Sequence, residues 1–146
     1  MAREKAEPMY QLIYTSEPTV EFSSQDIREL LAVARARNRI SLITGMLVFC
    51  DRQFLQVLEG NAPDVIRTYD RIAADARHDN LVALHRGYSH VGKTFTGMAM
   101  GFHSLALNEN LPAGFSREDG RVNFAHFDGL QALEFLMACR EQSAFA

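Results

Sequence analysis

The chain has 146 residues, of which 47% are hydrophobic and 23% are charged, with a formal net charge of −3. This length suits one domain, and the hydrophobic content excludes an intrinsically disordered chain. The lack of a basic excess argues against a nucleic-acid binder that works mainly through charge. No hydrophobic run reaches the ~18 residues of a membrane helix. Two cysteines without a CxxC pair indicate reduced thiols and a cytoplasmic location.

The first predicted elements are a strand and a helix. Residues 1–8 are polar and are expected to form a flexible tail before a strand at Tyr10–Ser16. A helix is predicted over Ser23–Arg37, because a capping-box pair, Ser23 and Asp26, begins it and apolar residues recur at helical spacing. Asn38 follows where that spacing stops and is interpreted as the C-terminal cap. The arginines off the apolar stripe are expected to face solvent: Arg28, Arg35 and Arg37.

Two paired strands are predicted next, at Leu42–Cys50 and Gln53–Leu58, although their short connection lacks the glycine favoured in such turns. Gly45 within the first of them indicates a bulge or the close approach of another group. A second helix is predicted over Asn61–His78, with Asn61 as its cap. Its buried face is expected to contain the apolar residues Val65, Ile66, Tyr69, Ile72 and Ala73.

Two further strands are predicted at Leu81–Val91 and Met98–Leu105, followed by a mixed linker and a helix from Asp128 to Glu141. The apolar face of this last helix is expected to hold Leu130, Leu133, Leu136 and Met137. The order β-α-β-β-α-β-β matches the split βαβ, ferredoxin-like unit. We therefore expect an α+β fold: a mixed five-stranded sheet, two helices on one face, and a C-terminal helical extension.

Gln56 is the least expected residue of the predicted sheet, because strand alternation places it on one face between Phe54 and Leu58. A buried amide costs free energy unless it is hydrogen-bonded. It could bond to the backbone or meet a polar ligand, since an amide both donates and accepts. Tyr14 raises the same question on the first strand, and the two side chains are partners if these strands lie close. Tyr14 is also the readiest electron donor, because the chain has no tryptophan.

Other polar residues keep two interpretations open. Asn38 either ends a helix or binds a ligand's carbonyl and ring N–H. The charged residues near the end of the second helix form either a solvated face or a phosphate clamp. These residues are Arg71, Asp75, Arg77 and His78, with Arg71 and Asp75 four apart and so on one helix face. No phosphate loop, HExxH or GxSxG motif occurs, and the five histidines show no metal-ligand spacing, so no metal is expected.

Together these segments resemble the BLUF family of flavin-binding blue-light sensors. The resemblance rests on LIYTS around Tyr14, RNRISLITGMLVF around Asn38, FLQVLEG around Gln56 and YDRIAADARH around Arg71, with MAMGF matching more weakly. It implies a flavin-binding domain over residues 9–105, with residues 106–146 as a linker and helix.

The resemblance implies FAD, or sometimes FMN, bound between the two helices over the sheet. Tyr14 would donate an electron and then a proton to the excited flavin. Gln56 would sit between Tyr14 and the flavin N5/O4 edge, and Asn38 would bind the C4 carbonyl and N3 side. Leu30 and Ile72 would sandwich the ring. The remaining implied site residues are Met100 beside the glutamine, Arg37 at a variable position beside Asn38, and Arg71, Asp75, Arg77 and His78 at the ribityl and phosphate groups.

Two departures from the family pattern concern residues that could pass the light signal on. Met98 stands where many members carry a tryptophan, and Lys93 replaces a nearby arginine. The fifth strand could therefore transmit the signal differently, whereas a photocycle that needs Tyr14 and Gln56 should survive.

The resulting hypothesis is a photosensor and not an enzyme, because the ~40 residues beyond the core are too few for a catalytic domain. Light would produce a red-shifted state that is passed to a separate protein partner or within a homo-oligomer, without nucleic acid or membrane. The C-terminal helix is the expected transmitter. Two alternatives stay open, because a fold does not fix a function: a ferredoxin-like flavoprotein reductase and a flavin-free small-molecule binding module.

Overall fold

The structure is a computed structural model that describes residues 9–89 and 94–143. Its elements in chain order are β1 (Met9–Pro18), α1 (Ser24–Ser41), β2 (Thr44–Cys50), β3 (Gln53–Gly60), α2 (Ala62–Ala73), β4 (His78–Ser89), β5 (Gly101–Leu105), the 3-10 turn η1 (Phe124–His126) and α3 (Gly129–Ser143). The predicted tail at 1–8, the predicted strand end at Val91 and the departure at Lys93 lie outside the described residues.

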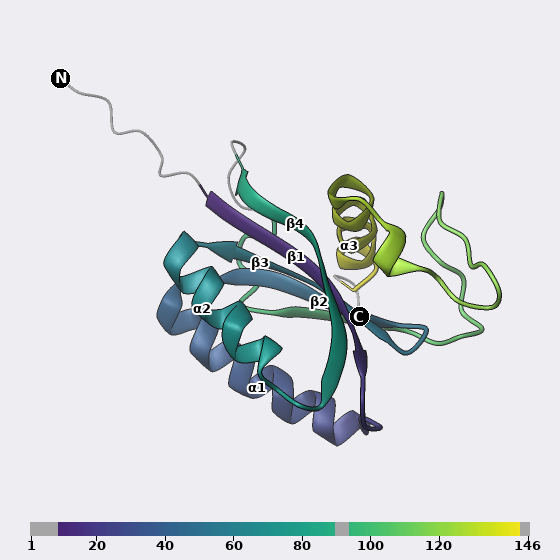
Figure 1. The fold of residues 1–146 in the computed structure, drawn as a ribbon, viewed down its shortest axis with the longest axis horizontal. Helices are drawn as coiled ribbons and strands as arrows, with labels where there is room; N and C mark the ends of the chain where they lie inside the picture. Colours follow the sequence, from purple (N-terminus) through teal and green to yellow (C-terminus); the bar gives the residue numbers. More distant parts are fainter. Residues whose placement is uncertain (1–8, 90–93, 144–146) are drawn as a thin grey trace.

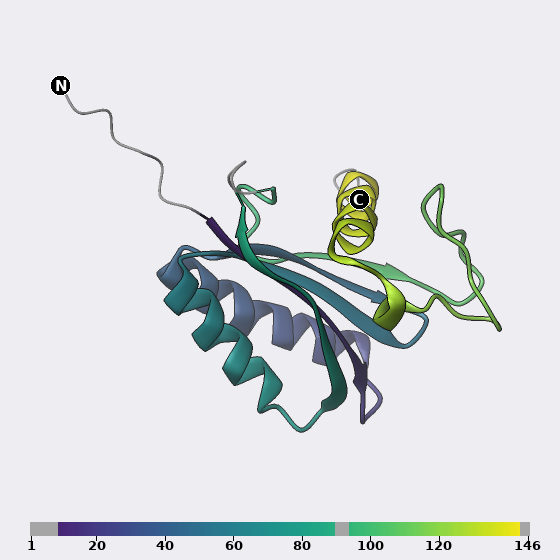
Figure 2. The ribbon, with the colours of Figure 1, turned by 45° about the horizontal axis from the view of Figure 1, so that its top comes forward.

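The five strands form one mixed sheet in the order β4-β1-β3-β2-β5. The central strand β3 runs antiparallel to both β1 and β2, and β5 runs parallel to β2. Helices α1 and α2 cover one face of the sheet and α3 covers the other (Figures 1 and 2). The predicted α+β, ferredoxin-like arrangement with a C-terminal helical extension is therefore confirmed.

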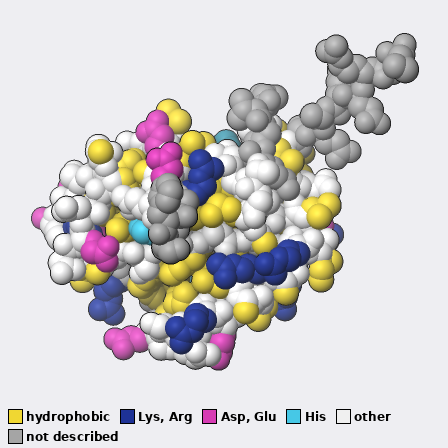
Figure 3. All heavy atoms as spheres, turned by 180° about the vertical axis from the view of Figure 1, so that it is seen from behind, with side chains coloured by type: hydrophobic (Ala, Val, Ile, Leu, Met, Phe, Trp, Pro, Cys, Tyr) yellow, Lys and Arg dark blue, Asp and Glu magenta, His cyan; other side chains and the backbone are white. Residues whose placement is uncertain are grey.

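Strand alternation separates two hydrophobic cores. On β3, Phe54 and Leu58 belong to the core beneath α1 and α2, whereas Leu55 and Val57 belong to the core beneath α3. The β2–β3 turn at Asp51 and Arg52 adopts positive φ angles of 51° and 61°, so the predicted hairpin forms without glycine. Viewed from behind (Figure 3), basic and acidic side chains are interspersed with hydrophobic ones.

Helix α1 is longer than the sequence predicts. The capping box of Ser23 and Asp26 is confirmed, but the helix continues to Ser41 and ends at Leu42 in a left-handed conformation with φ 55°. The prediction that Asn38 caps the helix was wrong. Its side chain donates instead to the backbone oxygen of Ala99, 2.6 Å away, so a tertiary contact replaces the local one.

Helix α2 is shorter than predicted, because the chain turns after Ala73 and the next strand begins at His78. The Asp75 carboxylate stabilises that turn by accepting from the backbone N–H of Arg77 at 3.0 Å. Asn61 is the N-cap residue, as predicted, but its side chain makes no capping hydrogen bond. Strand β5 also begins late, at Gly101, because the backbone of residues 98–100 bonds to β2 and α1 rather than continuing the ladder.

Three residues predicted to be buried are exposed. On α2, Ile66 and Ala73 face solvent, because the helix presents a stripe through Val65, Thr68, Tyr69 and Ile72 to the sheet. On α3, Leu130 is 65% exposed. The other predicted face residues of α3 are confirmed in the core: Leu133, Leu136 and Met137.

Gly45 is confirmed as a site of close approach. A Cβ atom at this position would lie 2.1 Å from the backbone oxygen of Val57 and 3.2 Å from Cε of Met100. Since the first contact is with backbone, a larger residue would force the two strands apart. The glycine thus lets β2 and β3 pair closely beneath Met100.

Candidate functional site

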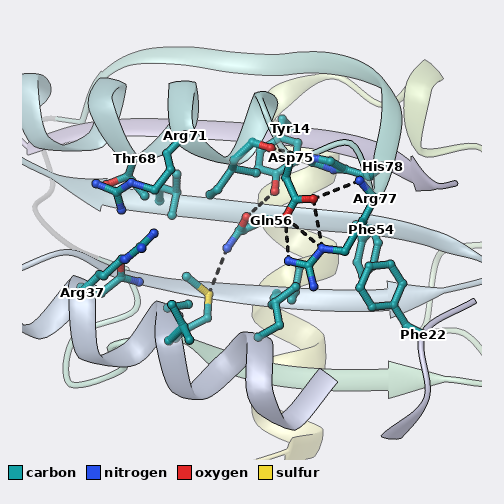
Figure 4. Close-up of a pocket in the computed structure, with 18 residues that line it drawn as sticks. Tyr14, Phe22, Arg37, Phe54, Gln56, Thr68, Arg71, Asp75, Arg77 and His78 are labelled. Atoms are coloured by element: carbon teal, nitrogen blue, oxygen red, sulfur yellow. Dashed lines mark hydrogen bonds and ion pairs between the residues drawn. The ribbon is translucent and has the colours of Figure 1, made fainter. Parts of the chain in front are cut away.

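A pocket of about 220 Å³ lies between α1 and α2, over strands β1, β2 and β3 (Figure 4). Every residue predicted for the site lines it: Tyr14, Leu30, Arg37, Asn38, Gln56, Arg71, Ile72, Asp75, Arg77, His78 and Met100. The sequence did not single out several apolar lining residues, including Phe22, Val33 and Leu47. They resemble ordinary core positions in the sequence, and no local pattern distinguishes them.

The floor of the pocket carries a short hydrogen-bonded row. The Tyr14 hydroxyl on β1 donates to Oε1 of Gln56 on β3, and these residues face each other across the two strands. Nε2 of Gln56 in turn lies 3.3 Å from Sδ of Met100. The partnership expected between Tyr14 and Gln56 is therefore present. Because one end of the amide accepts and the other donates, this row has a defined direction.

The Tyr14 phenol is held in its neutral form. Burial raises the pKa of Tyr14 well above its usual range, and the neighbouring Tyr69 and Asp75 raise it further. The Tyr69 ring packs edge-on against Tyr14 with 5.3 Å between centroids. The neutral hydroxyl is therefore favoured, in keeping with its role as the donor to Gln56.

Helix α1 supplies two further polar contacts beside the pocket. Asn38, 2% exposed, holds the carbonyl of Ala99, as described above. Arg35, which the sequence placed in solvent, is half-buried and donates from Nε to the carbonyl of Met100 at 2.9 Å. Its spacing of three residues from Asn38 puts both side chains on one helix face.

One end of the pocket is closed by ionic and imidazole contacts. Arg77 and Asp75 form an ion pair at 2.6 Å, and this hydrogen-bonded guanidinium lowers the pKa of Asp75 to about 2. His78 meets the carbonyl of Ile72 at 2.6 Å through Nε2 and the hydroxyl of Ser16 at 2.8 Å through Nδ1. Since a carbonyl only accepts, Nε2 carries a hydrogen. Both ring nitrogens of His78 are thus engaged within the protein.

The other end of the pocket is marked by Arg37 on α1 and Arg71 on α2, both exposed (Figure 4). The prediction that Arg71 and Asp75 share one helix face was wrong, because α2 ends at Ala73 and Asp75 pairs with Arg77. The predicted charged cluster is consequently split between the two ends of the pocket. The basic end is suited to anionic groups, since a guanidinium forms paired hydrogen bonds with phosphate oxygens.

The lining as a whole suits a ligand with an apolar body and polar groups at its edge. Leu30 on α1 and Ile72 on α2 provide apolar walls, while Gln56 and Asn38 offer amide groups that can donate or accept. Within residues 9–89 and 94–143, no group of three metal-ligating side chains is found. Within those same ranges, no helix is long and apolar enough to span a membrane.

Residues 9–101 match the sequence model of a family described as BLUF, sensors of blue-light using FAD. The chain is 31% identical over 138 residues to the blue light- and temperature-regulated antirepressor BluF of Escherichia coli strain K12. That alignment covers 92% of this chain and 34% of BluF, so the chain spans about a third of that relative's length. Over 73 residues it is 37% identical to photoactivated adenylate cyclase subunit alpha of Euglena gracilis, covering 50% of this chain and 7% of the cyclase.

Solved structures similar to this chain include a BLUF protein. The BlsA ground state superposes with a TM-score of 0.62 at 32% identity, covering 66% of this chain and 65% of that chain. The dark state of BlrB, a BLUF protein, gives 0.63 at 26% identity, with coverage of 66% and 73%. The photo-activated state of BlsA covers 94% of this chain and 96% of its own, with a TM-score of 0.72. At 22% identity, that last likeness concerns the fold alone.

Proposed function

This chain belongs to the BLUF family of flavin-binding blue-light sensors, and from that premise we propose that its light switch consists of Tyr14, Gln56 and Met100. The observation that carries the proposal is the hydrogen-bonded row of these three side chains on the floor of the pocket. The row has one mobile member, since the Gln56 amide can exchange its donor and acceptor ends by rotation or tautomerisation.

The proposed cofactor is FAD, with FMN as the alternative. A bound flavin supplies the absorption of blue light and an excited state that takes up an electron. Leu30 and Ile72 would contact the two faces of its ring, and Asn38 and Gln56 would meet its polar edge. Arg37 and Arg71 would bind ribityl or phosphate oxygens at the open end. Three other lining residues would close the opposite end: Asp75, Arg77 and His78.

Tyr14 is the proposed electron donor, because its ring lies beside Gln56 in the pocket and the chain contains no tryptophan. A phenol that has lost an electron becomes a strong acid. Its proton would then move along the existing hydrogen bond from Oη to Oε1 of Gln56. With a proton on Oε1, that atom would no longer accept from Tyr14, and release of a proton from Nε2 towards the ligand would leave the imidic acid tautomer, in which the donor and acceptor ends are exchanged. Rotation about the Cγ–Cδ bond would then withdraw the nitrogen from Met100 and turn it towards the ligand.

We assign the output to a surface change read by a protein partner or by a second copy of the chain in the cytoplasm, with no catalysis by this chain. Residues 9–105 would form the sensing part and residues 106–146 the output part. Strand β3 supports this assignment, because it presents Gln56 to the pocket and Leu55 and Val57 to the core that includes α3. A movement of β3 would therefore reach α3 directly.

A visible spectrum of the purified full chain, recorded before and after blue light, tests the proposal. We expect a yellow protein with a reversible red shift, which Gln56→Leu and Tyr14→Phe abolish while retaining flavin. The matched controls Gln25→Leu and Tyr88→Phe, both at exposed positions, should keep the shift. A colourless protein would support a flavin-free binding module. A yellow protein without a reversible shift would support a reductase.

A further inference from the structure

The three residues before β5 are held by an unusual set of bonds. Three consecutive carbonyls accept hydrogen bonds from three different donors on two other elements. The Met98 carbonyl accepts from the Gly45 N–H on β2 at 2.9 Å. The Ala99 carbonyl accepts from Nδ2 of Asn38 at 2.6 Å, and the Met100 carbonyl accepts from Nε of Arg35 at 2.9 Å. This segment is consequently fixed against β2 and α1 before the ladder to β2 resumes at Gly101.

The position of this backbone matters because of the side chain that it carries. Met100 is 2% exposed, and its sulfur is the partner of Gln56 Nε2 at 3.3 Å. A thioether is a weak acceptor on a flexible chain with three rotatable bonds. Its sulfur stays at the amide only if the backbone beneath it stays in place. The bond from Arg35 acts on the carbonyl of Met100 itself and is strengthened by the charge of the guanidinium.

We propose that Arg35 is a positioning residue of the light switch, which fixes Met100 so that its sulfur meets Gln56 Nε2 in the dark state. This role rests on the proposed function, which makes Met100 a member of the light switch. Arg35 is not among the described residues that line the pocket, so it acts through Met100 and does not contact the ligand. Loss of the Arg35–Met100 hydrogen bond should weaken the dark-state contact between Met100 and Gln56 and leave the flavin contacts in place.

A general structural role for Arg35 predicts a different pattern. Helix α1 carries another arginine, Arg28, which is exposed and hydrogen-bonds to Gln25 one turn earlier in the same helix at 2.8 Å. If Arg35 mattered only through helix propensity or surface charge, replacing either arginine would change stability to a similar extent. Neither change would then alter the environment of Met100. Arg28 is therefore the matched control.

The test compares Arg35→Met, Arg35→Lys and Arg28→Met in the flavin-loaded full chain. Arg35→Met keeps an apolar stem without a donor, whereas Arg35→Lys keeps a cationic donor. In the dark, the ¹³C-methyl NMR signal of Met100 is followed, after its assignment by Met100→Leu among the six native methionines and again among the seven of Arg35→Met and Arg28→Met. After illumination, the rate of return from the red-shifted state is measured.

We expect Arg35→Met to shift the Met100 methyl signal and Arg35→Lys to bring it back towards the wild-type position. The return to the dark state should slow by about three- to tenfold in Arg35→Met, because the state it returns to has lost a hydrogen-bonded partner. Arg28→Met should leave both readouts unchanged. Should Arg35→Met fail to fold, the milder Arg35→Gln is judged by the same shift of the methyl signal.

A Met100 methyl signal in Arg35→Met that coincides with the wild type would overturn the proposal. A shift that Arg35→Lys does not reverse would also overturn it, because the cause would then be the shape of the side chain and not its donor. If the wild type shows no red shift at all, the proposed function fails. The dark-state methyl comparison still decides in that case whether Arg35 positions Met100.

Discussion

The two faces of the sheet share the same strands but differ in chemistry. Beneath α1 and α2, buried polar side chains surround a cavity, and Tyr14, Gln56 and Asn38 are each 5% exposed or less. Beneath α3, the space is filled by large apolar groups, and Phe124 and Phe135 are both 0% exposed. One face thus keeps room for a ligand, and the other is closely packed.

Polar groups on the α3 face serve a different purpose. The buried ends of β3 carry Gln53, which donates to the Val122 carbonyl at 2.7 Å, and Glu59, which accepts from the Phe95 N–H at 2.8 Å. Both bonds join the sheet to backbone of the C-terminal half of the chain. The thiol of Cys139 lies in the same core, where burial raises its pKa to about 12. Polar groups on this face join the sheet to distant backbone in a filled core, whereas those on the other face line a cavity.

The comparison teaches that the strand period of two residues lets one segment perform two tasks. Along β3, Gln56 faces the pocket while its neighbours Leu55 and Val57 face α3. Substitutions on the α3 face should therefore change stability most. Substitutions on the pocket face should change photochemistry and ligand retention more than folding.

The largest expected effect is on the α3 face. Phe135→Ala should lower the free energy of unfolding by about 3–5 kcal/mol, because it leaves a cavity among packed aromatic rings. Phe135 lies 4.9 Å from Phe115 and 5.1 Å from Phe124, centroid to centroid. Urea denaturation measures the change. Leu130→Ala, at a position that is 65% exposed on the same helix, should change stability by less than about 0.5 kcal/mol.

The same packing bears on the proposed role of α3 in signal output. Complete undocking of α3 would expose Phe135 and Leu136 together, so deletion of the helix would destabilise the sheet as well as remove the proposed transmitter. The output is therefore better tested by the light dependence of oligomeric state in the full chain. Size-exclusion chromatography in dark and light measures it, and an assembly unchanged by light would contradict output through a second copy.

The next effect concerns ligand retention on the pocket face. Arg71→Ala should weaken flavin binding by about 1.5–3 kcal/mol, the typical value of a hydrogen bond to a charged group. The free energy of unfolding of the flavin-free protein should stay nearly constant, because Arg71 is exposed. Flavin release during dialysis and urea denaturation measure the two quantities. Equal flavin retention in variant and wild type would show that Arg71 is a solvated surface residue that does not bind the flavin.

A double-mutant cycle on the switch should give a similar or smaller effect. Gln56→Leu leaves the buried hydroxyl of Tyr14 without its acceptor, which should cost about 1–3 kcal/mol of stability. Adding Tyr14→Phe removes that hydroxyl and should recover much of the loss. Denaturation of the single and double variants measures the coupling. Additive effects of the two substitutions would contradict a direct bond between them.

The smallest expected effect is at the ionic end of the pocket. The pKa of Asp75 is lowered from 3.8 to about 2 by its bond to Arg77, so the charged carboxylate is favoured in the folded state. Its stabilisation is fully present above about pH 4 and is lost as the pH falls towards 2. Because these side chains are 34% and 49% exposed, solvent screening limits the effect to less than about 1 kcal/mol.

Asp75→Asn should therefore destabilise slightly at pH 7 and match the wild type near the acid end of that window. Denaturation as a function of pH measures the difference. Asp70→Asn, at an exposed position on α2, is the matched control and should show a smaller difference. A difference between Asp75→Asn and wild type that persists undiminished at pH 2 would show that the carboxylate acts through something other than its charge.

Local patterns in the sequence predicted most of the fold. Period-two alternation located the strands, helical spacing and the capping box of Ser23 and Asp26 located α1, and a two-residue connection predicted the hairpin at Asp51 and Arg52. Gln56 also stood out, because a buried amide is costly in a strand. These features depend on neighbours in the chain, so the chain order alone reveals them. Four pocket-lining residues were predicted only through the resemblance to the family: Leu30, Arg37, Ile72 and Met100.

Only the tertiary structure decided which groups bond to the segment before β5. Asn38 and Ala99 are 61 positions apart, and Arg35 and Met100 are 65 apart. No local pattern predicts such a pair, because it depends on how α1 packs beside the end of the sheet. For the same reason the sequence placed Arg35 in solvent and ended α1 too early at Asn38. Arg35 and Asn38 donate to carbonyls that only the packed fold brings within reach.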